Sequence, residues 1–145
     1  MDARKLLRRT KRYLLTRLWY STINFEKKDI TCNGVKFKVE IADTKRKILV
    51  GLMYRTKLRK NRGMLFVFAD EEKHGFWMFE TKIRLDIVWL NKNKKVVYIL
   101  RDAQPCISIF DCETVYPDKK ARYALEFKAG IVKELGIKLG DIIPV

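Results

Sequence analysis

The stretch GMLFVFADEEKHGFWMFETKIRLDIVWL, residues 63–90, is the most apolar and aromatic part of the chain. It predicts three strands, at 64–68, 76–80 and 85–90, separated by the polar segments 69–74 and 81–84. Apolar side chains occupy both the odd and the even positions of these strands, so both of their faces must be covered. We therefore expect the remaining chain to fold around these three strands.

Turn signals on both sides of this stretch favour antiparallel pairing. Asn33-Gly34 separates the apolar segments 30–32 and 35–41, and both turn residues tolerate positive φ. Further along, the polar turn 91–94 joins strand 85–90 to a strand at 96–100, and residues 121–128 alternate as another half-buried strand. Short helices are predicted after Thr44, as far as residue 52 or 53, and over 129–135, ended by Gly136. Residues 139–143 turn into a last short strand.

About seven short strands with one or two short helices are typical of a β-sandwich or a squat barrel. The sequence therefore predicts a mainly β protein: a single antiparallel β-sandwich or squat barrel over residues 29–145, preceded by a basic N-terminal helix over residues 1–28. A chain of 145 residues suits one such domain.

The net charge of +15, from 32 Lys+Arg and 17 Asp+Glu, attracts anions such as nucleic acid or anionic lipid. Residues 1–28 alone hold nine basic and two acidic residues, and leucines 7, 14 and 18 fall on one line of a helical wheel. The basic residues expected to contact an anionic surface are Lys5, Arg8, Arg9 and Arg12. Two interpretations are open: a helix that binds a membrane surface or nucleic acid, or a helix whose leucines pack on the domain.

No apolar run approaches the roughly 18 residues of a membrane span or the about 7–15 of a secretory signal, so we expect a cytoplasmic protein with peripheral membrane contact at most. Cys106 and Cys112 are expected to lie close together, either bridged or as free thiols. A four-ligand zinc site needs a second pair of ligands, which the chain lacks. We therefore expect no metal and no cofactor.

Asp86 stands between Leu85 and Ile87 at the start of a strand, where a carboxylate must find hydrogen-bond donors or shift its pKa upward. It either acts as a cation ligand or general base, or accepts backbone N–H groups or pairs with Arg55. Together with Arg55 and Glu80 it forms the candidate polar cleft of a small enzyme.

The sequence gives less support to a functional role for three other residues. Trp77 is expected to be largely buried, either lining an apolar groove or filling the core. Glu126 is expected to face Arg122 or Lys128. His74 reads as a loop residue without the partners of a catalytic set.

An ordered string of short motifs carries a family resemblance. The motifs are Ala42-Asp43-Thr44, Gly51-Leu52-Met53, Gly63-Met64-Leu65-Phe66, Phe76-Trp77-Met78, Leu85-Asp86-Ile87, Ala121-Arg122-Tyr123 and Gly140-Asp141. From about residue 35 onward the chain resembles the uncharacterised family catalogued as domain of unknown function 192. The resemblance implies a compact sandwich-like β domain found in bacteria and archaea, with no established activity. The family usually carries Asn at the position of Glu80 and Pro at the position of Arg84.

Two functions from different classes fit these patterns. One is a small binding or interaction domain, tethered to an anionic surface by its N-terminal helix. The alternative is a small enzyme with a polar cleft around Asp86, Arg55 and Glu80. The enzyme requires a pocket in which these three side chains converge. The binding domain requires them to be satisfied by structural bonds, with the leucines of the helix exposed.

Overall fold

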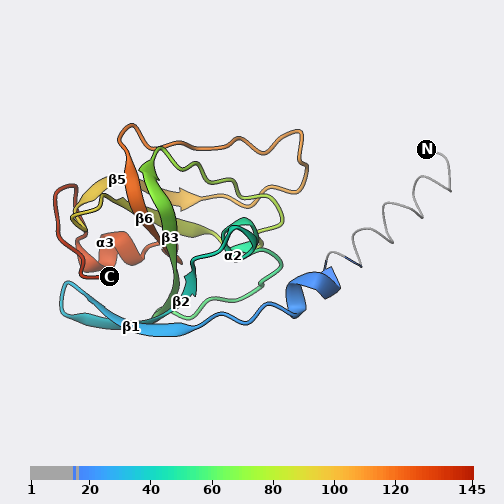
Figure 1. Cartoon of the computed structure of the whole chain (residues 1–145), viewed down its shortest axis with the longest axis horizontal. Coiled ribbons are helices and arrows are strands. Elements are labelled where there is room, and N and C mark those ends of the chain that lie inside the picture. The colour runs from blue at the N-terminus through green and yellow to red at the C-terminus, as the bar shows by residue number, and fades with distance from the viewer. Residues whose placement is uncertain (1–14, 16) are drawn as a thin grey trace, which may run out of the picture.

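The computed structural model describes Leu15 and residues 17–145. Lys5, Arg8, Arg9 and Arg12, and with them most of the predicted N-terminal helix, lie outside the described residues. Leu15 and residues 17–21 are helical, and the chain then runs extended into the first strand (Figure 1).

Six strands build one sheet in the order β1-β2-β3-β6-β4-β5. Their bounds are Lys27–Cys32 for β1, Val35–Ala42 for β2, Arg62–Glu72 for β3, Leu85–Leu90 for β4, Val96–Ala103 for β5 and Ala121–Lys128 for β6. Four neighbouring pairs are antiparallel, and β2 and β3 are parallel. The parallel pair arises because the connection through α2 (Lys45–Val50) crosses over and returns the chain in the same direction.

The mainly β class is confirmed, whereas the sandwich or closed barrel is wrong. The strands form one open mixed sheet, with β1 and β5 at its edges. The predicted strand at 76–80 is also wrong, since its residues form only isolated bridges, Phe76 with Val115 and Phe79 with Cys106. β3 and β4 already have partners on both sides, so neither offers an edge to this segment. The final strand is likewise reduced to one bridge between Lys95 and Ile142.

The turn and the helix ends that the sequence predicts are present in the structure. Asn33 and Gly34 have φ of 47° and 84°, and the hairpin closes with Cys32 opposite Val35. Thr44 caps α2 by accepting the backbone N–H of Lys47. The second helix, α3 (Ile131–Leu135), ends at Gly136 in the left-handed conformation.

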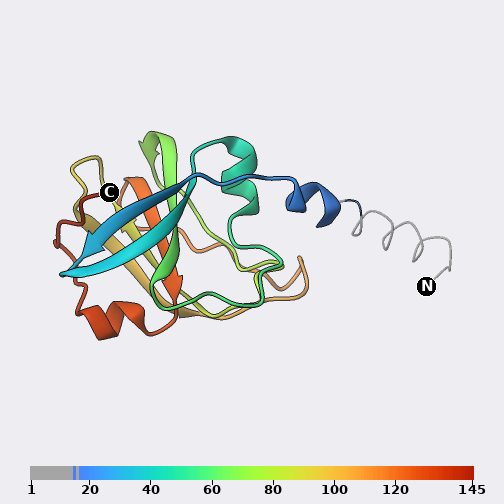
Figure 2. The same cartoon turned by 90° about the horizontal axis from the view of Figure 1, so that it is seen from below.

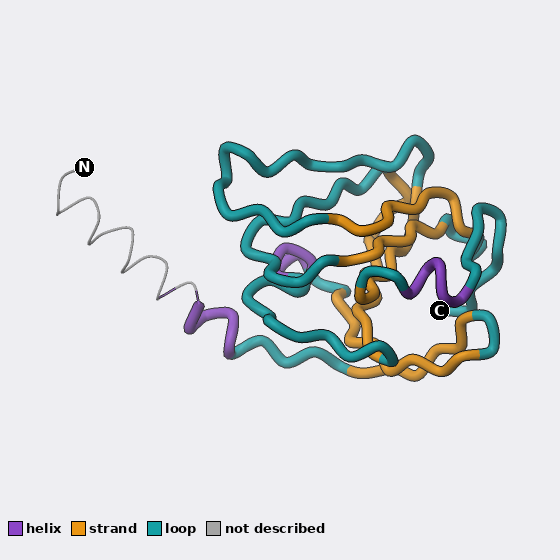
Figure 3. Tube along the Cα trace, turned by 180° about the vertical axis from the view of Figure 1, so that it is seen from behind, coloured by secondary structure: helices purple, strands orange, loops and turns teal. Residues whose placement is uncertain are grey.

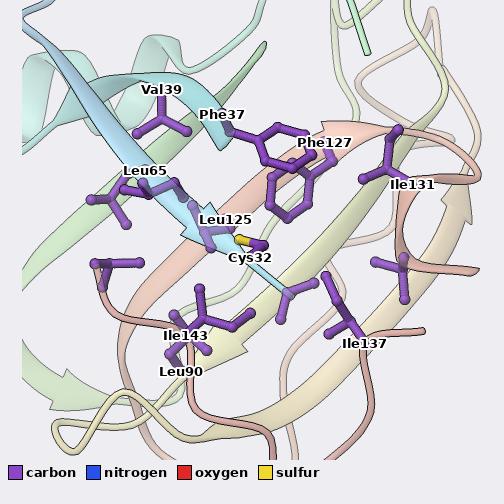
Figure 4. Packing of buried hydrophobic residues seen from close by; sticks show 14 of the residues in the cluster. Cys32, Phe37, Val39, Leu65, Leu90, Leu125, Phe127, Ile131, Ile137 and Ile143 are labelled. Carbon is purple, nitrogen blue, oxygen red and sulfur yellow. The ribbon is translucent and has the colours of Figure 1, made fainter. Parts of the chain in front are cut away.

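Both faces of the sheet are covered, as the central apolar stretch predicts. Figure 2 shows α2 and α3 on opposite sides of the sheet, and we call the two sides the α2 face and the α3 face. All six residues of β4 are buried. On the α3 face, residues of all six strands pack against α3 and the C-terminal segment (Figure 4). On the α2 face, long loops and α2 cover a second cluster that includes Phe66 and Trp89.

The position of β6 determines which side chains share a face. Asp86 pairs with Phe127, and Ile87 pairs with Glu126. Because successive side chains of a strand point to opposite faces, Asp86 lies on the α3 face and Glu126 on the α2 face. Glu126 also pairs with Met64, and Met64 with Glu40, so these residues form one row across the α2 face.

Candidate functional site

Asp86 is fully engaged in backbone hydrogen bonds. Its side chain is buried, and Oδ1 accepts the N–H of Asp102 at 2.9 Å. Oδ2 accepts the N–H groups of Gly130 and Val132, each at 2.9 Å. Gly130 is the N-cap of α3 and has no side chain, so Asp86 caps this helix from a distant strand. This arrangement is the structural one of the two expected for Asp86.

Arg55 and Glu80 lie elsewhere, on the α2 side of the sheet. Arg55 forms an ion pair with Glu40, whose row lies on the α2 face. The carbonyl of Glu80 accepts the backbone N–H of Tyr54 at 2.8 Å. Glu80 Oε2 lies 3.0 Å from Lys82 Nζ, in an ion pair whose angles fall outside hydrogen-bond geometry. Among the described contacts, none joins Asp86 to Arg55 or Glu80.

Glu126 is the carboxyl group that the sequence placed wrongly. Arg122 instead donates to the carbonyl of Ala69, and Glu126 is 5% exposed on the α2 face. Within the described part of the chain, its Oε2 has no hydrogen-bond partner. Burial raises the pKa of Glu126 to about 8, and the field of Arg55 partly opposes this rise. The alternation of 121–128 gave no sign of this burial, because it reads as a strand with one wet face.

Glu126 lines a pocket of about 180 Å³ between the segments 48–53 and 75–81. Its other lining residues are mainly apolar and aromatic: Ile48, Leu49, Val50, Leu52, Met53, Phe66, Phe68, Phe76 and Trp77, with Gly51, Gly75 and Thr81. Trp77 is only partly exposed and packs against Phe79 at 5.2 Å between ring centroids, which agrees with the expectation that it would be largely buried and line an apolar groove. The segment that carries it covers the sheet and does not enter it.

A second, larger cleft of about 830 Å³ is basic. Its charged lining residues are Lys82, Arg84, Asp86, Arg101, Asp102, Lys128 and Lys133. Arg84 binds the carboxylate of Asp102 through two hydrogen bonds of 2.6 and 2.7 Å, which lower the pKa of Asp102. Arg84 is paired with Asp102 and Lys82 with Glu80, so Arg101, Lys128 and Lys133 are the basic residues that give this cleft its positive field.

The helical residues before β1 show two kinds of side chain. Trp19 lies under Arg46, whose guanidinium carbon is 3.9 Å from the ring centroid, and Tyr20 packs against Tyr54. In contrast, Leu15 is 57% and Leu18 64% exposed. The segment is therefore anchored by its aromatic residues, while its described leucines face solvent.

The cysteines divide into one bridge and one buried thiol. Cys106 and Cys112 form a disulfide with 5.7 Å between their Cα atoms, which confirms their predicted proximity. Cys32 is buried, and burial raises the pKa of its thiol to about 12, so it is unreactive. The described residues hold no group of three His, Cys, Asp or Glu placed to bind a metal ion. None of the described helices is long and apolar enough to cross a bilayer.

The chain matches known proteins over nearly all of the β domain. Residues 28–145 match the model of the DUF192 family, described as "Uncharacterized ACR". A UPF0127 protein of Pyrococcus furiosus is 28% identical over 74% of this chain and 85% of its own length. A second, from Pyrococcus abyssi, is 28% identical over 80% of this chain and 90% of its own.

Two solved structures share the fold. One is a protein of unknown function from Novosphingobium aromaticivorans, with a TM-score of 0.78 and 29% identity, over 86% of this chain and 89% of that one. The other, from Sinorhizobium meliloti, is described as a "putative transcription regulator" and has a TM-score of 0.75 and 27% identity, over 84% of this chain and 95% of that one.

Proposed function

Because this chain belongs to the DUF192 family, whose description assigns no activity, we propose a function from its own geometry: it is a binding domain that docks on an anionic membrane surface through the helical residues before β1. The family match begins at residue 28, so this segment lies outside the matched residues. The observation that carries the proposal is the exposure of Leu15 and Leu18 next to Arg17, Trp19 and Arg46.

This combination of side chains suits the interface between water and lipid. Exposed leucines enter the boundary of the acyl chains, a Trp ring lies at headgroup level, and arginines contact anionic headgroups. The net charge of +15 attracts the whole domain to such a surface. The predicted contacts of Lys5, Arg8, Arg9 and Arg12 would add to this attraction.

A second apolar element lies toward the same end of the molecule. The loop between β5 and β6, orange in Figures 1 and 2, extends toward the end from which the helical segment projects. Its disulfide-closed part exposes Ile107, Ile109 and Phe110, which are 83%, 53% and 91% exposed. Seen from behind, loops also gather at this end, whereas the strands lie toward the other (Figure 3). A flat membrane could therefore meet both elements at once.

Nucleic acid is the competing anionic partner. The basic cleft offers lysines and arginines to phosphates, and one structural neighbour is described as a "putative transcription regulator". Phosphate contacts, however, make no use of exposed leucines. The enzyme alternative has less support, because Asp86 does not converge with Arg55 and Glu80 on one pocket.

The test is co-sedimentation of the full chain with phosphatidylserine-containing vesicles, beside a gel shift with RNA. Removing all residues before 28 would also remove Phe25, a buried core residue, so point variants are the sharper tool. Leu18→Glu is compared with Leu139→Glu, because Leu139 is 66% exposed but lies in the C-terminal segment.

Leu18→Glu should weaken vesicle binding at least about tenfold, which corresponds to roughly 1.4 kcal/mol, while Leu139→Glu leaves it unchanged. Replacing phosphatidylserine by phosphatidylcholine should also release the wild-type protein. Equal binding by both variants would contradict the proposal, and a shift of RNA without vesicle binding would favour nucleic acid.

A further inference from the structure

On the α2 face, we propose that the pocket over Glu126 binds a small neutral molecule that has an apolar body and one carboxamide group. This proposal does not rest on the membrane contact, because neither Leu15 nor Leu18 lines the pocket. It is carried by the shape and lining of the pocket and by one unpartnered polar group within it.

The pocket is a cavity of side-chain size with an accessible rim. Leu49, 57% exposed, and the half-buried Trp77 lie at the rim, whereas Phe66 and Glu126 are buried in its floor. Its volume of about 180 Å³ is below the roughly 300–1,000 Å³ of pockets that take drug-sized ligands. A guest with a single ring or a short chain fits such a space.

Glu126 determines which polar group the bound molecule must carry. A buried polar atom without a partner is costly, and Oε2 has none among the described residues. With its pKa raised to about 8, the carboxyl group is mostly neutral at pH 7 and presents an O–H donor beside a carbonyl acceptor. A carboxamide offers the matching acceptor and donor side by side, so that the two groups can exchange two hydrogen bonds.

Charged guests are disfavoured by the surroundings of Glu126. The charged groups on the neighbouring segments are Arg55, paired with Glu40, and Glu80, paired with Lys82. Of these, Arg55 acts electrostatically on Glu126 and repels a cation. An anion would have to leave water for an apolar, aromatic lining without an unpaired cation to receive it.

The walls of the pocket are held in place. Gly51 has a φ of 47°, and a Cβ there would lie 3.2 Å from Phe66 Cζ, so this wall packs closely on the floor. The bond from Tyr54 N–H to the Glu80 carbonyl ties the segments that form the two walls. Both residues have positive φ, a kind of backbone strain that clusters at ligand sites and active sites.

The experiment uses probes that share one ring and differ in one group: benzamide, benzylamine and benzoate, each titrated into the full-length protein by NMR at pH 6.5. Benzamide should bind at least about tenfold more tightly than the other two. Glu126→Gln keeps a donor and an acceptor and should retain benzamide binding, whereas Glu126→Leu should lose at least tenfold. Glu134→Gln, on α3, is the matched control and should change nothing.

The pH dependence gives a second readout. Wild-type affinity for benzamide should fall above pH 8, as Glu126 ionises, and the affinity of Glu126→Gln should stay level. Leu49→Trp, at the exposed rim, should block the pocket in a protein whose core is intact. Tighter binding of benzylamine or benzoate, no binding of benzamide, or benzamide binding unaffected by both Glu126→Leu and Leu49→Trp would each overturn the proposal.

Discussion

The backbone N–H of Tyr54 donates a 2.8 Å hydrogen bond to the carbonyl oxygen of Glu80, and both residues are left-handed, with φ of 63° and 56°. Neither residue type favours this conformation, which costs on the order of 1–3 kcal/mol at a non-glycine position. The bond joins the segment after α2 to the segment that carries Trp77. Two strained residues therefore hold the walls of the Glu126 pocket together.

Glu80→Asn is expected to stabilise the protein by about 1 kcal/mol, because Asn tolerates the left-handed region better than Glu. The change also removes a buried carboxylate whose only described ion pair, with Lys82, is partly exposed. It restores the residue usual in the family that the chain resembles. The midpoint of urea unfolding measures the effect.

Lys94→Asn is the control for Glu80→Asn, since Lys94 also has a positive φ, of 62°, but no buried carboxylate. Similar gains for both variants would assign the effect to the backbone alone. A lower midpoint for Glu80→Asn would contradict the prediction and show that the Glu80 side chain contributes to stability.

Glu126 should make the stability of the protein depend on pH. Its pKa is raised from 4.5 to about 8 in the folded state, so the unfolded chain ionises first. The contribution of Glu126 to the free energy of unfolding is favourable below pH 4.5 and is lost as the pH rises toward 8. Relative to Glu126→Gln, the wild type should lose on the order of 4 kcal/mol between pH 4.5 and 8, at about 1.4 kcal/mol per pKa unit. Urea unfolding of both proteins at pH 4.5, 6 and 8 checks this, and a constant difference would show that Glu126 is ionised in the fold.

Asp86→Ala should cost about 3 kcal/mol or more, because three backbone N–H groups would lose their acceptor. Hydrogen exchange at Gly130 and Val132 should accelerate, since both amides bond to Asp86 Oδ2. Asp102→Asn removes an exposed carboxylate but keeps a residue type that tolerates the positive φ of 54° at this position, and it should cost less than about 1 kcal/mol. Equal losses in the two variants would contradict the capping role of Asp86.

Removal of the disulfide should cost about 2 kcal/mol, because the bridge joins residues only six positions apart and closes a short loop. The double variant Cys106→Ser, Cys112→Ser is compared with the wild type by thermal unfolding. Thiol titration of the denatured, unreduced wild type should find the single thiol of Cys32. Three titratable thiols would contradict the bridge.

Local chemistry made several elements predictable. Asn33-Gly34 specified a hairpin because both residues accept positive φ, and Thr44 specified the start of α2 because its side chain caps the first turn. The continuous apolar sequence of β4 predicted that both of its faces are buried. The burial of Asp86 among apolar neighbours likewise pointed to hydrogen-bond donors, although the sequence did not say which.

The sequence did not indicate which strands pair with one another when they are far apart in the chain. The sequence pattern of β6 describes a strand, but it contains no information on which strands will lie beside it. β6 lies between β3 and β4 and pairs with both of them, so neither strand has a free edge with which residues 76–80 could pair. These residues therefore lie over the α2 face of the sheet and form only isolated bridges. The same insertion buried Glu126, which the pattern alone had placed toward solvent.

Thus hairpins, helix caps and the need for two covered faces follow from neighbouring residues, because backbone preference and side-chain periodicity act over a few positions. The open mixed sheet, the separation of Asp86 from Glu126 and the pocket between two strained segments follow from the order of the strands. That order depends on contacts between residues far apart in the chain, where many pairings satisfy the same local pattern and the packing of the whole core selects one.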